Sequence, residues 1–311
     1  MTAPHVIDGQ PPLWVRALAA GVPHLPVGRY WMVHHLRHFA ARPFMMRLPD
    51  RLGGYLYACD QRDSVAREVC YTGWYEPQET QIASRLLRTG DVFVDVGANW
   101  GYFALAAAHW VGPRGRIVAF EPEPRLHRML ASNIAANRLT SIEAHQIAVA
   151  AGPGRLSFVA FRADDGNWGR SHAAGPGMAT DFECATVGLD DALDAAGVGT
   201  VQLVKVDVEG GEAAVLAGMR AGLAAGRYRY VLLECHPALL ADRGESEQAC
   251  VNALIAAGYR AWTIAHSPDA HRRAAQVTLR AADLLRPYAA DAAFGAWPHV
   301  VAAAPGAPDP A

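Results

Sequence analysis

The stretch "DVFVDVGANWGYF", residues 91–103, decides the fold expected for this chain. An apolar run interrupted by Asp95 leads into two glycines, Gly97 and Gly101, that flank Asn99. A short apolar run that ends at glycine is typical of a buried strand, and "YFALAAAHWV" directly after it has the composition of a helix. We therefore expect a strand-to-helix turn at the carboxyl edge of a parallel sheet, where doubly wound folds bind their ligands.

The sequence on the C-terminal side of this turn continues the same alternation. "GRIVAFEP" is a predicted strand, "RLHRMLASNIAANRL" a helix and "IEAHQIAVA" a further strand. This βαβαβ order is typical of a parallel sheet with helices on both faces. More strands are predicted at "RLSFVAF", "VQLVKVDV", "YRYVLLECHP", "RAWTIA" and "PHVVAAA". The expected fold class is α/β, a doubly wound and mostly parallel sheet.

Composition divides the chain into three parts. Residues 1–70 are expected to form a cap of helices and a hairpin around Gly53 and Gly54, residues 71–303 the main domain, and residues 304–311 a disordered tail. The apolar residues of the first 45 positions have helical spacing, which favours packing on the chain's own domain. The same spacing also fits a membrane surface or a homodimer contact through these helices.

Charge and cysteine content exclude several classes of protein. The chain has 311 residues, with 28 basic and 30 acidic side chains and no long run of either sign, which disfavours a nucleic-acid partner. No apolar run is long enough for a membrane span, so we expect no stable membrane insertion. The 5 cysteines have no zinc-like or disulfide-like spacing, and an odd number of reduced thiols favours a cytoplasmic location.

The turn after the first strand has the pattern D-x-G-x-N-x-G, in place of the G-x-G-x-x-G of dinucleotide sites. The carboxylate of Asp95 repels a pyrophosphate and attracts a cation such as a sulfonium with an amino-acid ammonium. Glu121, at the tip of the next strand, can accept hydrogen bonds from both ribose hydroxyls of a nucleoside, as acids in NAD enzymes also do. Ala148 is small and leaves room for a flat adenine, although packing alone also explains it.

With these residues in place, the chain resembles the FkbM family of S-adenosylmethionine-dependent methyltransferases, named for enzymes that O-methylate macrolide natural products. The similar segments are "FVDVGANWGYFALAAAHWVGPRGRIVAFEPEP", "ASNIAANRL", "AVA", "LVKVDVEGGEAAVLAG" and "LLECHP", in this order between Tyr71 and Pro237. The N-terminal arm and the chain after about Leu240 match only loosely.

The resemblance implies a class I methyltransferase fold, a seven-stranded sheet whose last strand is antiparallel. It implies S-adenosylmethionine as cofactor, with Glu121 at its ribose. The residues implied at its methionine end are Asp95, Gly97, Asn99 and Gly101. Tyr102 and Pro122, which directly follow Gly101 and Glu121, are grouped with the cofactor-binding residues, as are Ala148 and Asp207.

A second group of polar residues follows the later strands. Lys205, Asp207 and Glu209 alternate at the end of one strand, and Glu234 and His236 alternate at the end of the next. Asp207 or His236 as general base is favoured, with Lys205 beside them and Glu209 and Glu234 toward the substrate. The alternative is a divalent metal bound by Asp207, Glu209, Glu234 and His236. The presence of Lys205 among these residues makes a metal site less favoured. A structural ion pair of Lys205 with one carboxylate is the third interpretation.

The segment 162–182 is rich in glycine and polar residues, and we expect it to be a mobile loop. Asn167, Trp168 and Gly169 in this loop are candidates to close over the methyl acceptor, while Trp168 also suits a loop anchor. The expected acceptor is a hydroxyl of a small molecule, a secondary metabolite or a sugar. Alternatives are cyclisation of the cofactor, aminopropyl transfer, a binding module without turnover, and an NAD-dependent oxidoreductase, which lacks its tyrosine-lysine pair here. The platform motifs of nucleic-acid methyltransferases are absent from the sequence.

Overall fold

The computed structural model describes residues 7, 9–22, 25, 32–33, 35–36, 42–162, 166–175, 177–289, 294 and 298–310. Within these ranges a central sheet has the strand order β13-β12-β14-β11-β10-β3-β4-β5. Its strands are β3 (Val92–Val96), β4 (Arg116–Phe120), β5 (Ile142–His145), β10 (Val201–Val206), β11 (Tyr228–Glu234), β12 (Arg260–Ile264), β13 (Leu285–Pro287) and β14 (His299–Ala303).

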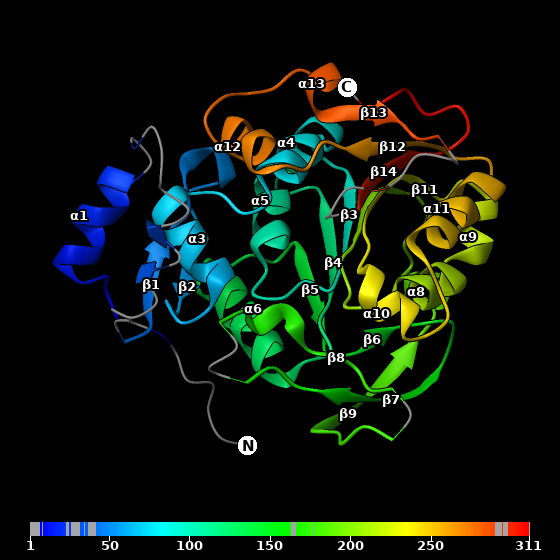
Figure 1. The fold of residues 1–311 in the computed structure, drawn as a ribbon, viewed down its shortest axis with the longest axis horizontal. Helices are drawn as coiled ribbons and strands as arrows, with labels where there is room; N and C mark the ends of the chain where they lie inside the picture. Colours follow the sequence, from blue (N-terminus) through cyan, green and yellow to red (C-terminus); the bar gives the residue numbers. More distant parts are fainter. Residues whose placement is uncertain are drawn as a thin grey trace.

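Strands β5, β4, β3, β10 and β11 pair in parallel, whereas β14 lies between β11 and β12 and is antiparallel to both (Figure 1). This order is that of the seven-stranded class I methyltransferase sheet, and the short strand β13 extends its edge. The expected α/β fold with a mostly parallel, doubly wound sheet is therefore confirmed.

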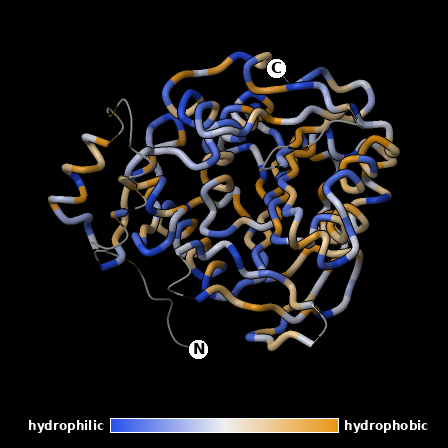
Figure 2. Tube along the Cα trace, viewed as in Figure 1, coloured by the Kyte–Doolittle hydropathy of each residue, from blue (hydrophilic) through white to orange (hydrophobic). Residues whose placement is uncertain are grey.

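Helices cover both faces of the sheet, and the apolar residues are concentrated along its central strands (Figure 2). The helices after residue 70 are α4 (Pro77–Leu86), α5 (Tyr102–Val111), α6 (Pro124–Ala136), α7 (Leu189–Ala195), α8 (Glu212–Gly218), α9 (Arg220–Ala224), α10 (Pro237–Ala241), α11 (Glu247–Ala256), α12 (Pro268–Ala274) and α13 (Ala281–Leu284). In the part of the chain that the structure describes, no helix has the length and apolar character required to cross a bilayer.

Strand register determines which polar residues meet. Lys205 on β10 pairs with Asp95 on β3, and Glu234 on β11 pairs with His299 on β14. Because the carboxyl ends of parallel strands share one edge of a sheet, the residues that follow β3, β4, β10 and β11 gather at that edge.

A second sheet differs from the expectation. The prediction of one continuous strand at "IEAHQIAVA" is wrong, because β5 ends at His145 and residues Ala148–Val149 form a separate strand, β6. Strand β6 belongs to a four-stranded sheet of order β6-β9-β7-β8. Its other strands are β7 (Gly154–Val159), β8 (His172–Ala173) and β9 (Phe182–Val187). The predicted strand at "RLSFVAF" is β7, in this sheet. The expected loop contains β8 and a short helical turn, η4 (Trp168–Arg170), while residues 163–165 and 176 lie outside the described ranges.

The expected hairpin around Gly53 and Gly54 is present: β1 (Phe44–Arg47) pairs antiparallel with β2 (Leu56–Cys59) across the turn η3 (Asp50–Leu52). Helix α3 (Ser64–Thr72) follows it, and α1 (Leu13–Gly21) precedes it. Side chains of α6 bind the backbone of β2, with Asn133 Oδ1 accepting from Ala58 N at 2.8 Å. The hairpin of the cap thus shares its packing with the main domain. Most of the second predicted arm helix lies outside the described residues.

The C-terminal segment also differs from the disordered tail expected for residues 304–311. Ala304 and Ala307 are buried, and the Tyr230 hydroxyl donates to the Pro308 carbonyl at 3.0 Å. Arg260 forms an ion pair with Asp309. Glycine and proline content predicted disorder, but the segment that follows β14 is held against β11 by Tyr230 and against β12 by Arg260. Residue 311 is outside the described part.

Candidate active site

A cavity of about 1140 Å³ opens at the carboxyl edge of the central sheet. The predicted site residues that line it are Gly97, Asn99, Glu121, Pro122, Ala148, Asn167, Gly169, Asp207, Glu209, Glu234 and His236. They come from the ends of β3, β4, β10 and β11, from β6 and from the turn η4 with its preceding residue. A volume of this size accommodates a cofactor and a small acceptor together.

The glycine turn after β3 is shaped chiefly by close contacts inside the protein. Gly97 has φ +87°, and a Cβ built on it would lie 1.8 Å from the carbonyl oxygen of Asp207. Gly101 has φ +86°, and its Cβ would meet Leu130 at 2.5 Å. Gly97 also borders the cavity, whereas Gly101 caps α5 behind the cavity wall. The turn therefore needs glycine for its own geometry, in addition to any need for ligand space.

Asp95 is the predicted anion of this turn, and it lies beneath the cavity wall, with 2% of its surface exposed. Burial raises the pKa of Asp95 to about 7, against the attraction of Lys205. Its Oδ2 atom is buried and has no hydrogen-bond partner within the described part of the chain. Tyr102 is likewise buried behind the wall, where its ring contacts Tyr75 edge-on at 5.8 Å between centroids.

Glu121 borders the cavity at the tip of β4 and is held by two backbone N–H groups. Asn99 N donates to its Oε2 at 2.8 Å and Glu123 N donates to its Oε1 at 2.9 Å. Burial nevertheless raises the pKa of Glu121 to about 8. Asn99 has φ +51°, a left-handed conformation that asparagine tolerates, and its Oδ1 is buried without a partner. The two N–H bonds leave the carboxylate fixed in direction and with lone pairs for a ligand.

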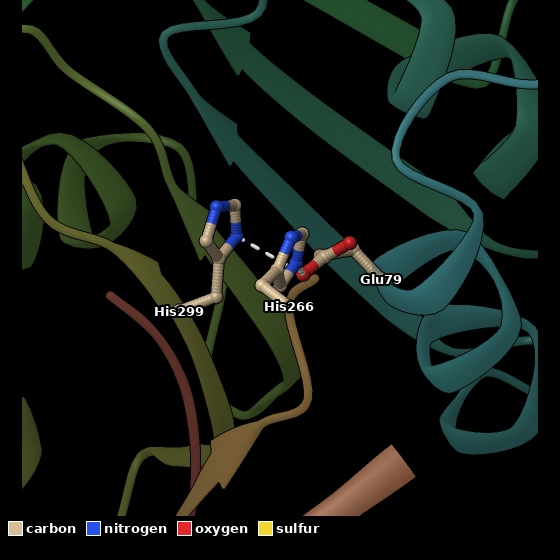
Figure 3. Close-up of side chains that lie close together, drawn as sticks. All are labelled: Glu79, His266 and His299. Carbon is tan, nitrogen blue, oxygen red and sulfur yellow. Dashed lines mark hydrogen bonds and ion pairs between the residues drawn. The ribbon is translucent and has the colours of Figure 1, made fainter. Parts of the chain in front are cut away.

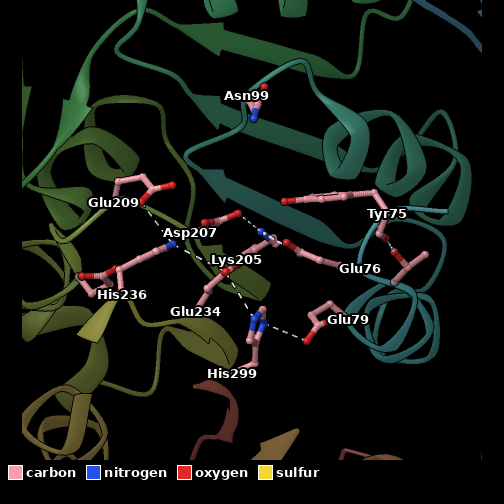
Figure 4. A network of polar contacts seen from close by, with 12 residues as sticks. Tyr75, Glu76, Glu79, Asn99, Lys205, Asp207, Glu209, Glu234, His236 and His299 are labelled. Atoms are coloured by element: carbon pink, nitrogen blue, oxygen red, sulfur yellow. Dashed lines mark hydrogen bonds and ion pairs between the residues drawn. The ribbon is translucent and has the colours of Figure 1, made fainter. Parts of the chain in front are cut away.

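The predicted polar group after β10 and β11 assembles as expected (Figure 4). Lys205 is 3% exposed, and its Nζ lies 2.6 Å from Asp207 Oδ2 and 3.4 Å from Glu76 Oε2. It also lies 4.6 Å from the centroid of the Phe103 ring, outside the cavity lining. The ion-pair interpretation of Lys205 therefore fits its surroundings, with two carboxylates in place of one.

His236 is a basic residue of the cavity wall. Its Nδ1 lies 2.6 Å from Oε1 of Glu212, a residue whose side chain is fully buried. Its Nε2 faces Glu209 Oε2 at 3.6 Å and Glu234 Oε1 at 3.7 Å. Burial lowers the pKa of His236, but the hydrogen bond with Glu212 and the charges of Glu209, Asp207 and Glu234 outweigh burial and raise it to about 10.

The carboxylates around His236 are themselves perturbed. Burial raises the pKa of Glu209, and burial together with the nearby Asp207 and Glu76 raises the pKa of Glu234 well above its usual range. Lys205 has the opposite effect on Asp207, whose pKa is lowered although burial opposes the shift. Asp207, Glu234 and His236 each offer a ligand atom within 4.8 Å of the others, which is the geometry that the metal alternative requires.

Trp168 serves as the loop anchor that the sequence left as an alternative. Its ring stacks on Phe161 at 5.1 Å between centroids and lies 5.7 Å from Trp100. Its backbone N–H donates to Asp63 Oδ1 at 2.9 Å. This anchoring places Asn167 and Gly169, on either side of the tryptophan, in the cavity wall.

Sequence reasoning missed Glu212, Tyr75 and Glu76. Glu212 follows Glu209 across Gly210 and Gly211, and the turn directs it under His236. Tyr75 lines the cavity, and Glu76 follows it with φ +42°. The sequence signal for the turn at Glu76 was the proline that follows it, Pro77, because proline is common at the first position of a helix.

The sequence matches known proteins over part of its length. A family model described as Methyltransferase FkbM domain matches residues 95–261. The 31-O-demethyl-FK506 methyltransferase FkbM of Streptomyces tacrolimicus is 30% identical, over 43% of this chain and 61% of that protein. This chain therefore spans less than two thirds of that relative.

The fold of the chain is also similar to solved structures. Fibrillarin from Aeropyrum pernix, in complex with S-adenosyl-L-methionine, has a TM-score of 0.40 at 16% identity, covering 73% of this chain and 75% of that chain. An S-adenosylmethionine-dependent O-methyltransferase from Thermotoga maritima has a TM-score of 0.37 at 12% identity, covering 74% and 66%. Since the family model matches more than half of the sequence, this chain belongs to the FkbM family of S-adenosylmethionine-dependent methyltransferases.

Proposed function

We propose that this protein is an O-methyltransferase that transfers the methyl group of S-adenosylmethionine to a hydroxyl of a small molecule, a secondary metabolite or a sugar. The observation that carries the proposal is the pair formed by His236 and Glu212, in which a buried carboxylate holds one imidazole nitrogen and the other faces the cavity. Hydroxyl acceptors need a base of this kind, because their proton must leave when the methyl group arrives.

The cavity fits the cofactor of the family. Glu121 is held toward the cavity by two N–H bonds, as an acceptor for ribose hydroxyls requires. Pro122, Leu126 and Ala148 also line the cavity, and their apolar side chains suit an adenine ring. Asn99 Oδ1 and Glu234 Oε2 are buried polar atoms that lack partners, and the ammonium and sulfonium of the methionine end are suitable partners for such oxygens.

The residues that would hold the cofactor are therefore Glu121, Asn99, Gly97, Pro122, Ala148 and Asp207, with Asp95, Gly101 and Tyr102 supporting the turn from behind. When bound, S-adenosylmethionine supplies an electrophilic methyl group on a positively charged sulfur. Lys205 neutralises Asp207 and Glu76 and so positions Asp207 at the cavity edge; we assign it a positioning role.

His236 is the proposed general base. Its Nδ1–H donates to Glu212, which selects the tautomer whose Nε2 lone pair faces the cavity and accepts the hydroxyl proton. Glu209, Glu234 and Glu212 then stabilise the imidazolium that forms. The pKa of about 10 in the ligand-free cavity falls when a cation enters the same cavity, because like charges disfavour protonation. Asp207 is the less suitable base, since Lys205 keeps its pKa low.

The acceptor is proposed to bind between Asn167 and Gly169 on one side and Glu209 and Glu234 on the other. These side chains offer carboxylate and amide oxygens, which suit an acceptor with several hydroxyl groups. We also propose a cytoplasmic location and a homodimer formed through the N-terminal helices.

The test is a methyl-transfer assay with the purified full chain and panels of small hydroxylated compounds, in which formation of S-adenosylhomocysteine and of the methylated product are both measured. We expect the two to form in equal amounts with at least one acceptor and to fail together in His236→Gln. Cofactor consumption without a methylated product would instead favour cyclisation or aminopropyl transfer.

A further inference from the structure

Glu79, His266 and His299 form a buried cluster behind the cavity, and no step proposed above uses it. The three residues come from α4, from the segment after β12 and from the start of β14, which lie far apart in the sequence (Figure 3). Their side chains are 1%, 7% and 5% exposed. We propose that this cluster is a binding site for one zinc ion.

The donor atoms already converge. His266 Nε2 lies 2.5 Å from Glu79 Oε1, and His299 Nδ1 lies 3.0 Å from the same oxygen. All three residues have a ligand atom within 4.8 Å of those of the other two. Two imidazoles and a carboxylate are a donor set that suits zinc. A tetrahedral zinc with bonds of about 2.0–2.1 Å needs donor atoms roughly 3.3 Å apart. His266 Nε2 would therefore move about 0.8 Å away from Glu79 Oε1, and His299 Nδ1 about 0.3 Å away from it.

A second carboxylate oxygen supports a ligand at this position. Glu79 Oε2 is buried and has no hydrogen-bond partner among the residues that the structure describes, although a buried carboxylate oxygen is costly to leave unpaired. A zinc ion bound by one oxygen of Glu79 and the two imidazoles has three protein donor atoms among the described residues. A water molecule would complete the tetrahedron, and Glu79 Oε2 could accept a hydrogen bond from it. The rings of His266 and His299 are stacked 3.9 Å apart between centroids. Two imidazolium cations would repel at that distance, whereas neutral imidazoles, the metal-binding form, would not.

The surroundings fix the ligands as the partners of metal-binding residues commonly do. His299 presents its other nitrogen, Nε2, to Glu234 Oε1 at 3.4 Å, an arrangement that orients metal-bound histidines through a carboxylate. Gln78 Nε2 donates to the Ala265 carbonyl at 3.2 Å and so ties the segment that carries His266 to α4. Gln81 Nε2 does the same at the Ala274 carbonyl, at 2.6 Å.

The site would hold together three segments that are separated in the sequence: α4, the segment after β12 and the start of β14. It holds α4, which carries Tyr75 and Glu76 at its start, against the strand pair β14 and β12. Through His299 it also contacts Glu234 at the cavity wall. The inferred role is structural, because the site lies outside the cavity lining and its ligands are buried.

The test uses the full chain and the metal alone. Zinc content is measured after purification, and cobalt is then titrated into the metal-depleted protein while the visible absorption and the melting temperature are recorded. We expect one equivalent of zinc, an intense visible cobalt band of tetrahedral type and a higher melting temperature with metal. His266→Gln and His299→Gln should each lose the band, while His271→Gln on the neighbouring helix α12 should keep it.

Two results would overturn the proposal. The first is a wild-type chain that binds neither metal stoichiometrically, which does not depend on whether the variants fold. The second is binding that survives in both His266→Gln and His299→Gln but disappears in His236→Gln, which would place the metal at Asp207, Glu234 and His236.

Discussion

Glu212 Oε1 lies 2.6 Å from Nδ1 of His236, and this contact joins a fully buried carboxylate to the one imidazole that borders the cavity among the residues proposed for catalysis. The carboxylate determines which nitrogen of His236 carries the proton and raises its basicity. Removal of His236 and removal of Glu212 should therefore have different effects on catalysis.

His236→Gln removes the base and retains the size of a polar side chain. We expect the turnover number to fall by about 10²–10⁴, the usual contribution of a general base. The affinity for S-adenosylhomocysteine, measured by titration calorimetry, should change little, because the residues assigned to the ribose and adenine are untouched. Equal turnover in His236→Gln and wild type would remove His236 from the mechanism.

Glu212→Gln should alter the pH dependence. A base acts in its deprotonated form, so activity rises as the pH passes the pKa of His236, and the hydrogen bond with Glu212 helps to keep that pKa high. Without the Glu212 carboxylate this hydrogen bond is weaker and the pKa falls, so we expect the rising limb of kcat/KM against pH to move to lower pH while the plateau drops. Glu245→Gln, which removes another acidic residue of the cavity wall, is the matched control. A limb that stays in place would contradict the pairing.

Glu121 should make cofactor binding depend on pH. Its pKa of about 8 means that the ionised form, which accepts ribose hydroxyls, is populated as the pH rises through 8. Affinity for S-adenosylhomocysteine should therefore strengthen from pH 6 to pH 9, by up to about tenfold per pH unit below the pKa. Glu121→Gln should bind weakly and lose most of this slope. Asp95, with a pKa of about 7, titrates in the same pH range. The variant Asp95→Asn therefore measures how much of the pH dependence of binding comes from Asp95.

Gly97→Ala should destabilise the protein whether or not a ligand is present. A Cβ at this position would lie 1.8 Å from the Asp207 carbonyl oxygen, and the residue has φ +87°. We expect the free energy of unfolding, measured with denaturant, to fall by at least about 2–3 kcal/mol. Gly199→Ala is the control, since its added Cβ would meet no atom within 4 Å. Similar losses in both variants would show that the close approach at Asp207 is not the cause.

Lys205→Met tests the buried charge group. Loss of the ammonium leaves Asp207 and Glu76 close together and without their cation, so we expect a loss of about 3–5 kcal/mol in the free energy of unfolding. The combination with Asp207→Asn and Glu76→Gln should recover much of it, because neutral amides need no counter-charge. An unchanged stability in Lys205→Met would contradict the arrangement.

Local sequence patterns predicted much of the fold and part of the site. The strand ends at Asp95, Glu121 and Asp207 were predictable, because each follows a short apolar run. Alternation also placed Glu234 and His236 near the same edge. The contacts of His299 were not predictable, since they depend on β14 inserting between β11 and β12. The second sheet was missed for a related reason: β9 pairs with β7 across a glycine-rich segment whose composition resembles a loop.

The contacts of Lys205 and of Glu212 differ in the same way in how far the sequence predicts them. Lys205 and Asp207 are two residues apart, so their contact followed from strand geometry. Glu212 lies beyond two glycines, and the direction of its side chain depends on the positive φ of Gly210, which no periodicity reveals.

The central claim is that this cavity holds the cofactor with its reacting end toward His236. A crystal structure of the full chain with S-adenosylhomocysteine tests it most directly. We expect the ribose hydroxyls to bind Glu121, the adenine to lie against Ala148, and the sulfur to face the part of the cavity that His236 borders. A bound molecule whose ribose lies away from Glu121, or a cavity that admits NAD and excludes S-adenosylhomocysteine, would contradict the account.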